Sequence, residues 1–313
     1  MEFNIQRFGD TEYLKDNLNG FVPQVVSDEI IGEVVRGSSV LRLSQIEYLE
    51  SDNKKFSVIK SGLGAFWTDE AARIKTQVAE WDFPEIKVKK IAVIVPLTKE
   101  KLNDATIDIF GTLQGYIAEA FYKAIDSACL FGINSPFDDS IVSAAIASGN
   151  VVGDNQNNSL DLNISDVMAK VEAAGYDVNG FAAGLDLKNS LRKLRDLNGN
   201  QLYVEGVDRQ TLYNQPIEFN RNDAWDSTKA LAIAGEWKYS IVGIRSEIEY
   251  TINDTATLQT VTMADGKPLS LFENDMAALK ATMRIGFLPV QPKAFAILQP
   301  SGGQTYTTGR SKS

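Results

Sequence analysis

A single long amphipathic helix, predicted over residues 105–131, limits how this chain can fold. Its apolar side chains recur at spacings of three and four, the period of one helix face: Ile107, Phe110, Leu113, Ile117, Ala120, Phe121, Ala124 and Ala128. Gly132 follows, at the position where glycine commonly ends a helix. About 25 residues at 1.5 Å each make a helix of roughly 40 Å, long for a globular domain. We therefore expect a spine around which the other elements are arranged.

A long hairpin is predicted before this spine. Its arms are residues 55–60 and 85–95, and residues 85–89 alternate between apolar and charged, as in a strand exposed on one face. About twenty residues separate the arms, and a structureless loop of that length is uncommon in a compact domain. Trp67 and Trp81 argue against disorder, because disordered segments are poor in aromatic residues. We interpret the insertion as a projecting element that packs on another chain.

The remaining segments predict an α/β unit followed by a long strand. Residues 277–287 alternate strictly, which indicates a strand with one buried face. Helices are predicted at 27–37 and 98–103. Two further helices are predicted, one that contains Val167 and is capped by Asn163 or Ser165, and one that contains Leu191. Residues 149–158 are expected to form an exposed loop. Shorter strands are predicted at residues 180–183, 216–219, 231–234, 239–244, 247–252 and 295–297.

Composition excludes several function classes. The chain has no histidine, so a Ser-His-Asp triad and histidine-based metal sites are impossible. Cys129 is the only cysteine, which excludes an intramolecular disulfide framework. With 31 basic and 41 acidic residues the formal net charge is −10, which disfavours tight binding to phosphate. No apolar run approaches the ~20 residues of a membrane span.

No catalytic, cofactor or metal site is predicted. Asp138 and Asp139 offer paired carboxylates, but acidic pairs on loops are usually solvated. Asp154, Asn155 and Asn157 carry oxygen ligands without the alternating pattern of a calcium loop, so a plain polar loop is the preferred interpretation. The basic residues Lys87, Lys89 and Lys90 fit the solvated face of a strand.

Taken in order, these segments resemble the major capsid proteins of tailed bacteriophages, the Hong Kong 97 fold. The resemblance rests on short stretches at corresponding places: Phe21-Val22-Pro23, Trp67-Thr68-Asp69-Glu70, Asp126-Ser127-Ala128 with Phe131-Gly132, Ala174-Gly175-Tyr176 and residues 191–199. It implies an α+β fold with an N-terminal arm, an extended loop (the E-loop), a peripheral domain with the spine helix, and an axial α/β domain. The implied boundaries are 1–22 for the arm, 23–52, 91–135 and 246–291 for the peripheral domain, 53–90 for the E-loop, 136–245 and 292–299 for the axial domain, and 300–313 for a tail.

The resemblance implies a structural subunit, not an enzyme, that self-assembles into the icosahedral shell around phage double-stranded DNA. Its partners would be itself, in hexamers and pentamers, a portal and a decoration protein, with weak contact to DNA and none to membranes. The short start over residues 1–8 implies either a separate scaffolding protein or none. The protein is expected in the virion, after assembly in the host cytoplasm.

The expected inter-subunit contacts lie in the arm and the E-loop. The candidate residues are Phe3, Phe8, Trp67, Glu70, Arg73, Lys75 and Trp81. Some relatives join subunits through a Lys–Asn bond, but no local pattern supports one between Lys75 and Asn274. Two alternatives stay open: an encapsulin-type compartment of the same fold, and a phage-tail carbohydrate-binding domain in which tryptophans stack on sugar.

Overall fold

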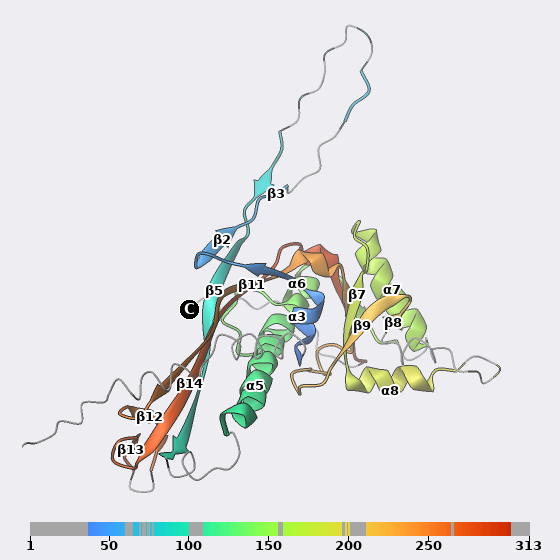
Figure 1. Ribbon diagram of the computed structural model, residues 1–313. Helices are drawn as coiled ribbons and strands as arrows, with labels where there is room; N and C mark the ends of the chain where they lie inside the picture. Colours follow the sequence, from blue (N-terminus) through green and yellow to red (C-terminus); the bar gives the residue numbers. More distant parts are fainter. Residues whose placement is uncertain are drawn as a thin grey trace, which may run out of the picture. The chain divides into compact units, whose positions relative to one another are not determined.

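The computed structural model describes residues 37–301, apart from 60–64, 69, 71–72, 74–75, 77, 100–108, 156–158, 196–197, 199, 201–210 and 264–265 (Figure 1). The predicted arm, almost all of the helix at 27–37, residues 100–103 of the short helix and nearly all of the tail lie outside the described residues. The described chain divides into two compact units. Unit 1 contains Lys90–Phe121 and Ser246–Met283; unit 2 contains Ser38–Lys89, Tyr122–Arg245 and the chain from Arg284.

The α/β part of unit 2 is built on a sheet in which six strands are described. The strand order is β6-β15-β10-β7-β9-β8, and β7 lies parallel to β9 and antiparallel to β10. The strands are β6 (Val151–Gly153), β7 (Gly180–Gly184), β8 (Thr211–Leu212), β9 (Gln215–Asn220), β10 (Ala232–Gly235) and β15 (Phe295–Gln299). The predictions for β7, β9, β10 and β15 are confirmed. The prediction of a loop was wrong at β6, because Val151 and Val152 pair in parallel with Ile297 and Leu298.

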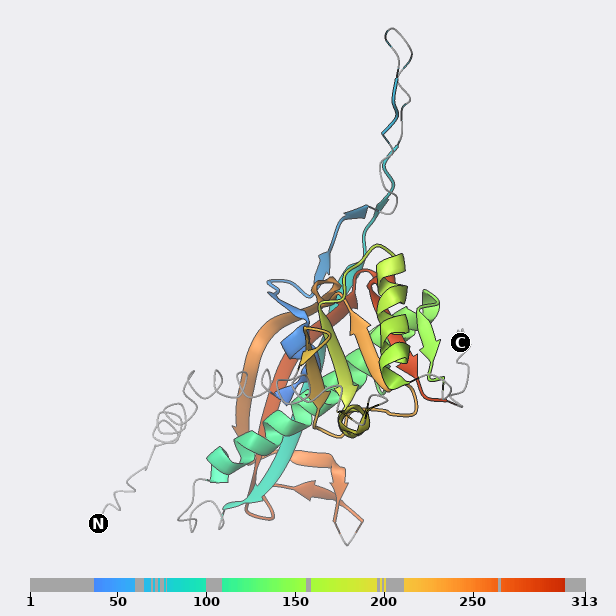
Figure 2. The same cartoon turned by 90° about the vertical axis from the view of Figure 1, so that its right-hand side faces the viewer.

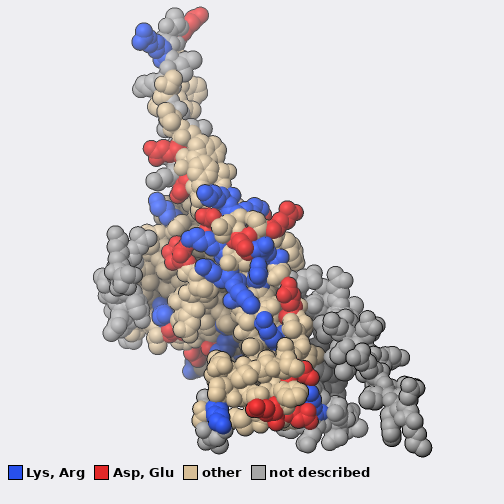
Figure 3. All heavy atoms as spheres, turned by 90° about the vertical axis from the view of Figure 1, so that its left-hand side faces the viewer, with Lys and Arg blue, Asp and Glu red and all other residues tan. Residues whose placement is uncertain are grey.

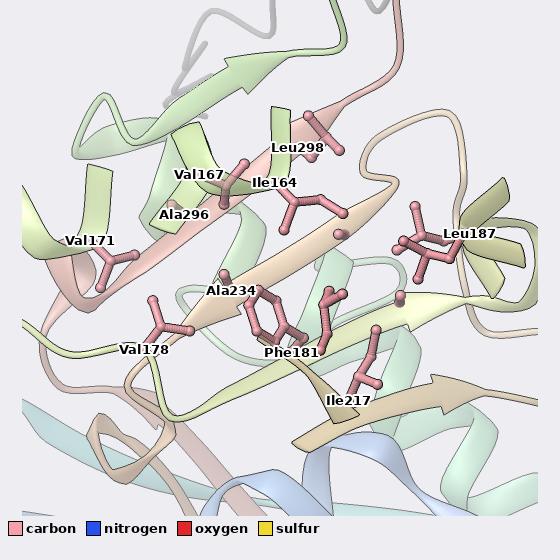
Figure 4. Close-up of a cluster of buried hydrophobic side chains, with 14 of the residues drawn as sticks. Ile164, Val167, Val171, Val178, Phe181, Leu187, Ile217, Ala234, Ala296 and Leu298 are labelled. Carbon is pink, nitrogen blue, oxygen red and sulfur yellow. The ribbon is translucent and has the colours of Figure 1, made fainter. Parts of the chain in front are cut away.

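Three helices pack against strands of this sheet: α6 (Ile141–Ala147), α7 (Leu160–Ala173) and α8 (Leu185–Lys193). Side chains of α7 and α8 meet strand residues in one buried cluster that includes Val167, Leu187, Phe181 and Ala234 (Figure 4). In Figure 2, α7 runs alongside the strands and α8 is seen nearly end-on. The predicted caps Asn163 and Ser165 were wrong. The N-cap is Ser159, and Asn163 lies inside the helix, buried, with its amide donating to Asp154 Oδ1 at 2.7 Å.

A second sheet has the order β1-β11-β14-β5-β2 in the described chain. Its members are β1 (Gln45–Tyr48), β2 (Asn53–Lys55), β5 (Glu85–Thr98), β11 (Ser240–Asn253) and β14 (Met276–Pro289). The prediction of separate strands at 239–244 and 247–252 was wrong: both belong to β11, which is paired along the sheet. β5 also continues through Pro96 to Thr98, where a helix was expected. Smaller elements are α3 (Ser39–Leu43), β12 (Thr257–Thr262), β13 (Pro268–Ser270), and the 3-10 turns η1 (Trp237–Tyr239) and η2 (Pro292–Ala294).

The spine helix is α5 (Ile109–Phe131), as predicted, and Gly132 ends it with φ +68°. Ile117 and Phe121 are buried, as the periodicity indicates. Ala120 and Ala124 are exposed instead of buried, so their assignment to the apolar face was wrong. Other buried residues of the helix are Ala118, Ile125, Ala128 and Cys129. Their spacing fits one helix face, since a helix has 3.6 residues per turn.

Candidate inter-subunit contact surface

The E-loop is a hairpin whose base belongs to unit 2. Strand β2 pairs with the start of β5, with Asn53 opposite Lys87, and Phe56 N–H donates to Pro84 O at 2.9 Å. Two short strands follow, β3 (Val58–Ile59) and β4 (Trp81–Asp82), which pair antiparallel. Figure 1 shows this ribbon running on beyond the end of β2. The predicted hairpin is therefore present, with backbone pairing at its base and along β3 and β4.

One face of this ribbon is apolar and uncovered in the single subunit. Ile59 and Trp81 are cross-strand partners and are 45% and 53% exposed. Phe83 lies just beyond the end of β4 and is 58% exposed. Neighbouring side chains on one face of a sheet contact one another. The structure thus brings together a small apolar patch that stays about half exposed among the described residues.

Exposed apolar side chains are concentrated in this hairpin. Of the fifteen large apolar residues that are exposed in the described chain, six lie between residues 59 and 83: Ile59, Phe66, Trp67, Val78, Trp81 and Phe83. Trp67 is fully exposed, at 105%. Covering a large apolar side chain is worth about 1.5–3 kcal/mol relative to leaving it in water. A second surface that covered these residues would therefore be strongly favoured.

The predicted contact residues can be located in part. Trp67, Glu70, Arg73 and Trp81 are all exposed on the hairpin. Phe3, Phe8 and Lys75 lie outside the described residues. Sequence reasoning missed Ile59, Phe66, Val78 and Phe83 as members of the exposed set. One signal in the sequence could have indicated Phe83. Trp81 and Phe83 alternate with the acidic residues Glu80 and Asp82, a pattern typical of an extended segment with one apolar side.

At the hairpin base, Lys87 forms an ion pair with Asp138. Lys87 Nζ lies 2.8 Å from Asp138 Oδ2, so one of the two carboxylates weighed as a catalytic pair is bound to a lysine. This hydrogen bond and the negative charge of Asp138 raise the pKa of Lys87. Within the described residues no three acidic or cysteine side chains gather to hold a metal ion. No helix there combines the length and apolarity that a membrane span requires.

A buried hydrogen-bond network is centred on Asp126, in the C-terminal half of the spine helix. The Asp126 carboxylate is inaccessible to solvent and accepts hydrogen bonds from Ser38 Oγ at 2.5 Å, Ser39 N at 3.0 Å and Val40 N at 3.2 Å. The side-chain amides of Asn220 and Asn222 donate to it at 2.9 and 2.8 Å. Burial raises the pKa of Asp126, although these hydrogen bonds act in the opposite direction. The network joins three separate segments of unit 2.

Comparison with known proteins agrees with this architecture. Residues 19–299 match the phage capsid family. The major capsid protein of Staphylococcus phage 80alpha is 32% identical over 299 residues, which cover 95% of this chain and 90% of that protein. A solved structure from Microbacterium phage Oxtober96 has a TM-score of 0.74 at 26% identity, covering 84% of this chain and 91% of that one. One from Mycobacterium phage Cain has a TM-score of 0.71 at 25% identity, covering 84% and 90%.

These matches confirm the α+β fold of the Hong Kong 97 type that the order of segments implied. They cover the spine helix, both sheets and the E-loop together, so the likeness concerns the whole architecture and not one segment. The relatives carry the name of a structural shell protein and not of an enzyme. The chain belongs to the phage capsid family and is a major capsid protein, a structural subunit of the shell of a bacteriophage particle.

Proposed function

We propose that this subunit builds an icosahedral shell of hexamers and pentamers around phage double-stranded DNA, and that the E-loop is its principal contact with a neighbouring subunit. The observation that carries this proposal is the apolar patch of Ile59, Trp81 and Phe83, whose side chains are 45–58% exposed in the described chain. An isolated two-stranded ribbon is only marginally stable in water. A neighbouring copy of the chain supplies the missing surface.

The chemistry of the hairpin fits such a contact. Trp67 and Trp81 are anchor residues of the kind that dominate protein interfaces. Glu70 and Arg73 are exposed beside them and supply the polar rim that surrounds an apolar centre. We assign Phe3, Phe8 and Lys75 to the same set of contacts, as the resemblance implied.

The domain assignment follows the same family pattern. The peripheral domain comprises residues 23–52, 91–135 and 246–291, the E-loop 53–90, and the axial domain 136–245 and 292–299. In this proposal a scaffolding protein, a portal and a decoration protein complete the particle, which is assembled in the host cytoplasm. Contact with the packaged DNA is weak, because the chain carries a net charge of −10.

Deletion of residues 64–81 tests the role of the hairpin. The subunit should stay soluble and folded, because the hydrophobic clusters of unit 2 contain no residue of this segment. Closed shells, observed by electron microscopy, should be absent. A matched control replaces exposed Leu162 of α7, also 53% exposed, by Ser and should still form shells. Normal shells from the deletion variant would contradict the proposal.

The nature of the cargo is tested on native particles that contain this chain. We expect them to enclose double-stranded DNA, measured by nuclease protection and extraction. Particles that enclose enzymes and no nucleic acid would identify an encapsulin-type compartment instead.

A further inference from the structure

Helix α8 (Leu185–Lys193) and the residues just after it carry a group of basic side chains that form no ion pair with a described acidic residue. This α8 basic cluster consists of Lys188, Arg192 and Lys193 on the helix and Arg195 just after it. Elsewhere in the described chain nine basic residues form ion pairs: Arg42, Lys54, Lys87, Lys99, Lys123, Lys229, Lys238, Arg245 and Arg284. No described carboxylate pairs with a member of the cluster. Figure 3 shows the contrasting situation on one face of the molecule, where basic and acidic side chains are interspersed.

Three of the four members of this cluster are exposed. Leu187 and Leu191 are buried in the cluster of unit 2, while Arg192, Lys193 and Arg195 are exposed. The stem of Lys188 is half-buried, with its Nζ 5.1 Å from the centre of the Phe219 ring. Residues four apart lie on the same side of a helix, so Lys188 and Arg192 are neighbours.

Local stabilisation of the helix does not account for the whole cluster. Cations in the last turn interact favourably with the helix dipole, and Arg195 Nη1 donates to the carbonyls of Arg192 and Leu194 at 2.7 and 3.0 Å. Lys188 lies in the middle of the helix, where the dipole has little effect. Like charges four residues apart destabilise a helix. The acidic residue of the helix, Asp186, is at the opposite end and accepts from Ser227 Oγ at 3.0 Å.

We propose that the α8 basic cluster contacts phosphates of the packaged double-stranded DNA; this inference rests on the proposed function, that the shell encloses DNA. The six helical residues from Lys188 to Lys193 span roughly 8 Å, and Arg195 lies just beyond them. Phosphates of one strand follow at about 3.4 Å along the duplex axis. The cluster can therefore reach about three phosphates. A few such contacts in each subunit hold DNA weakly and without sequence preference, since phosphates carry no sequence information.

The test measures binding of unassembled full-length subunits to a 30-base-pair duplex at a series of salt concentrations. In the test variant Lys188, Arg192 and Lys193 are each replaced by Gln. The control variant replaces Lys55, Lys89 and Lys170 by Gln; these exposed lysines form no ion pair with a described residue. Both variants lose three positive charges, so they differ only in position.

Each phosphate contact adds about 0.9 to the slope of log K against log salt. The test variant should lose roughly 2–3 from this slope and at least tenfold in affinity at low salt, while the control stays close to the wild type. The test variant should also still form shells. Equal losses in both variants, or no loss in the test variant, would overturn the inference. Loss of shells with unchanged DNA binding would assign the cluster to a protein contact instead, and would leave the proposed function standing.

Discussion

Ser38 Oγ donates a hydrogen bond of 2.5 Å to Asp126 Oδ1, although 88 residues separate the two in the chain. Ser38 is also the N-cap of α3, because its hydroxyl accepts from Leu41 N at 3.2 Å. The same carboxylate accepts from amides at the end of β9, as described above. One buried anion thus fixes the start of α3 and the turn after β9 to the spine helix, and no basic side chain of the described chain pairs with it.

Asp126→Asn should destabilise the subunit by roughly 2–3 kcal/mol, measured by chemical denaturation. The amide nitrogen replaces an acceptor oxygen that faces N–H donors, and buried donors left without a partner are costly. Asp138→Asn is the control, since Asp138 is exposed and its pair with Lys87 contributes little. Equal effects of the two substitutions would contradict the role given to the buried carboxylate.

The pH dependence of the same variant has a definite sign. Burial raises the pKa of Asp126 above its usual 3.8, so the charged form is the less favourable one in the folded state. A raised carboxyl pKa contributes stability that is fully present below the unfolded pKa and is lost as the pH rises through the folded pKa. The stability of the wild type relative to Asp126→Asn should therefore increase as the pH falls from 7 toward 4. A decrease over this range would show that the hydrogen bonds outweigh burial.

Trp67→Ala should change assembly and leave the stability of the isolated subunit within about 0.5 kcal/mol, because an exposed side chain removed from the surface has little effect on folding. The concentration at which shells appear should rise, since interface anchors can contribute about 2 kcal/mol or more. Trp237→Ala is the matched control. Trp237 is 1% exposed, so its truncation should destabilise the subunit by about 3–5 kcal/mol. Reduced stability of the Trp67 variant with an unchanged assembly threshold would place Trp67 in an internal core.

Phe121→Asp should prevent folding. Phe121 is 1% exposed on the spine helix, and an unpaired buried carboxylate costs several kcal/mol, comparable with the stability of a domain. Ala120→Asp places the same charge one residue earlier, at an exposed position, and should leave a folded subunit. Circular dichroism and thermal unfolding distinguish the two. Loss of structure in both variants would mean that the buried face of the helix is wrongly assigned.

Two glycine substitutions should act in opposite directions. Gly115 lies in the spine helix with no atom within 4 Å of an added Cβ, so Gly115→Ala should stabilise the subunit by about 0.5–1 kcal/mol. At Gly235 the added carbon would clash with Phe295 Cδ1 and would lie 2.7 Å from the Ala294 carbonyl oxygen. Gly235→Ala should therefore destabilise by about 1–3 kcal/mol, as overpacking does. Thermal unfolding of both variants provides the measurement, and shifts of the same sign would contradict it.

Features with a local period were predictable. The spine helix and β14 each repeat their apolar residues at the spacing of one buried face, so Phe121 and Met283 were correctly expected to be buried. The hairpin was recognised for a different local reason: two alternating arms enclose a segment that has aromatic residues and no core. Glycine at position 132 marked the end of the helix because it can adopt a positive φ.

Features that depend on distant partners were not predictable. Val151 and Val152 form β6 because β15, some 145 residues later, offers them an edge, and β11 stays continuous because it is paired along the sheet. Nothing near Asp126 in the chain reveals that its hydrogen-bond donors come from α3 and β9. Likewise, the alternation around Trp81 predicts a strand face, but only the folded subunit shows that this face stays uncovered. Burial and strand pairing depend on contacts between residues far apart in the chain, so they are decided by the tertiary structure. Helical and strand periods depend on neighbouring residues, so they can be recognised in the sequence.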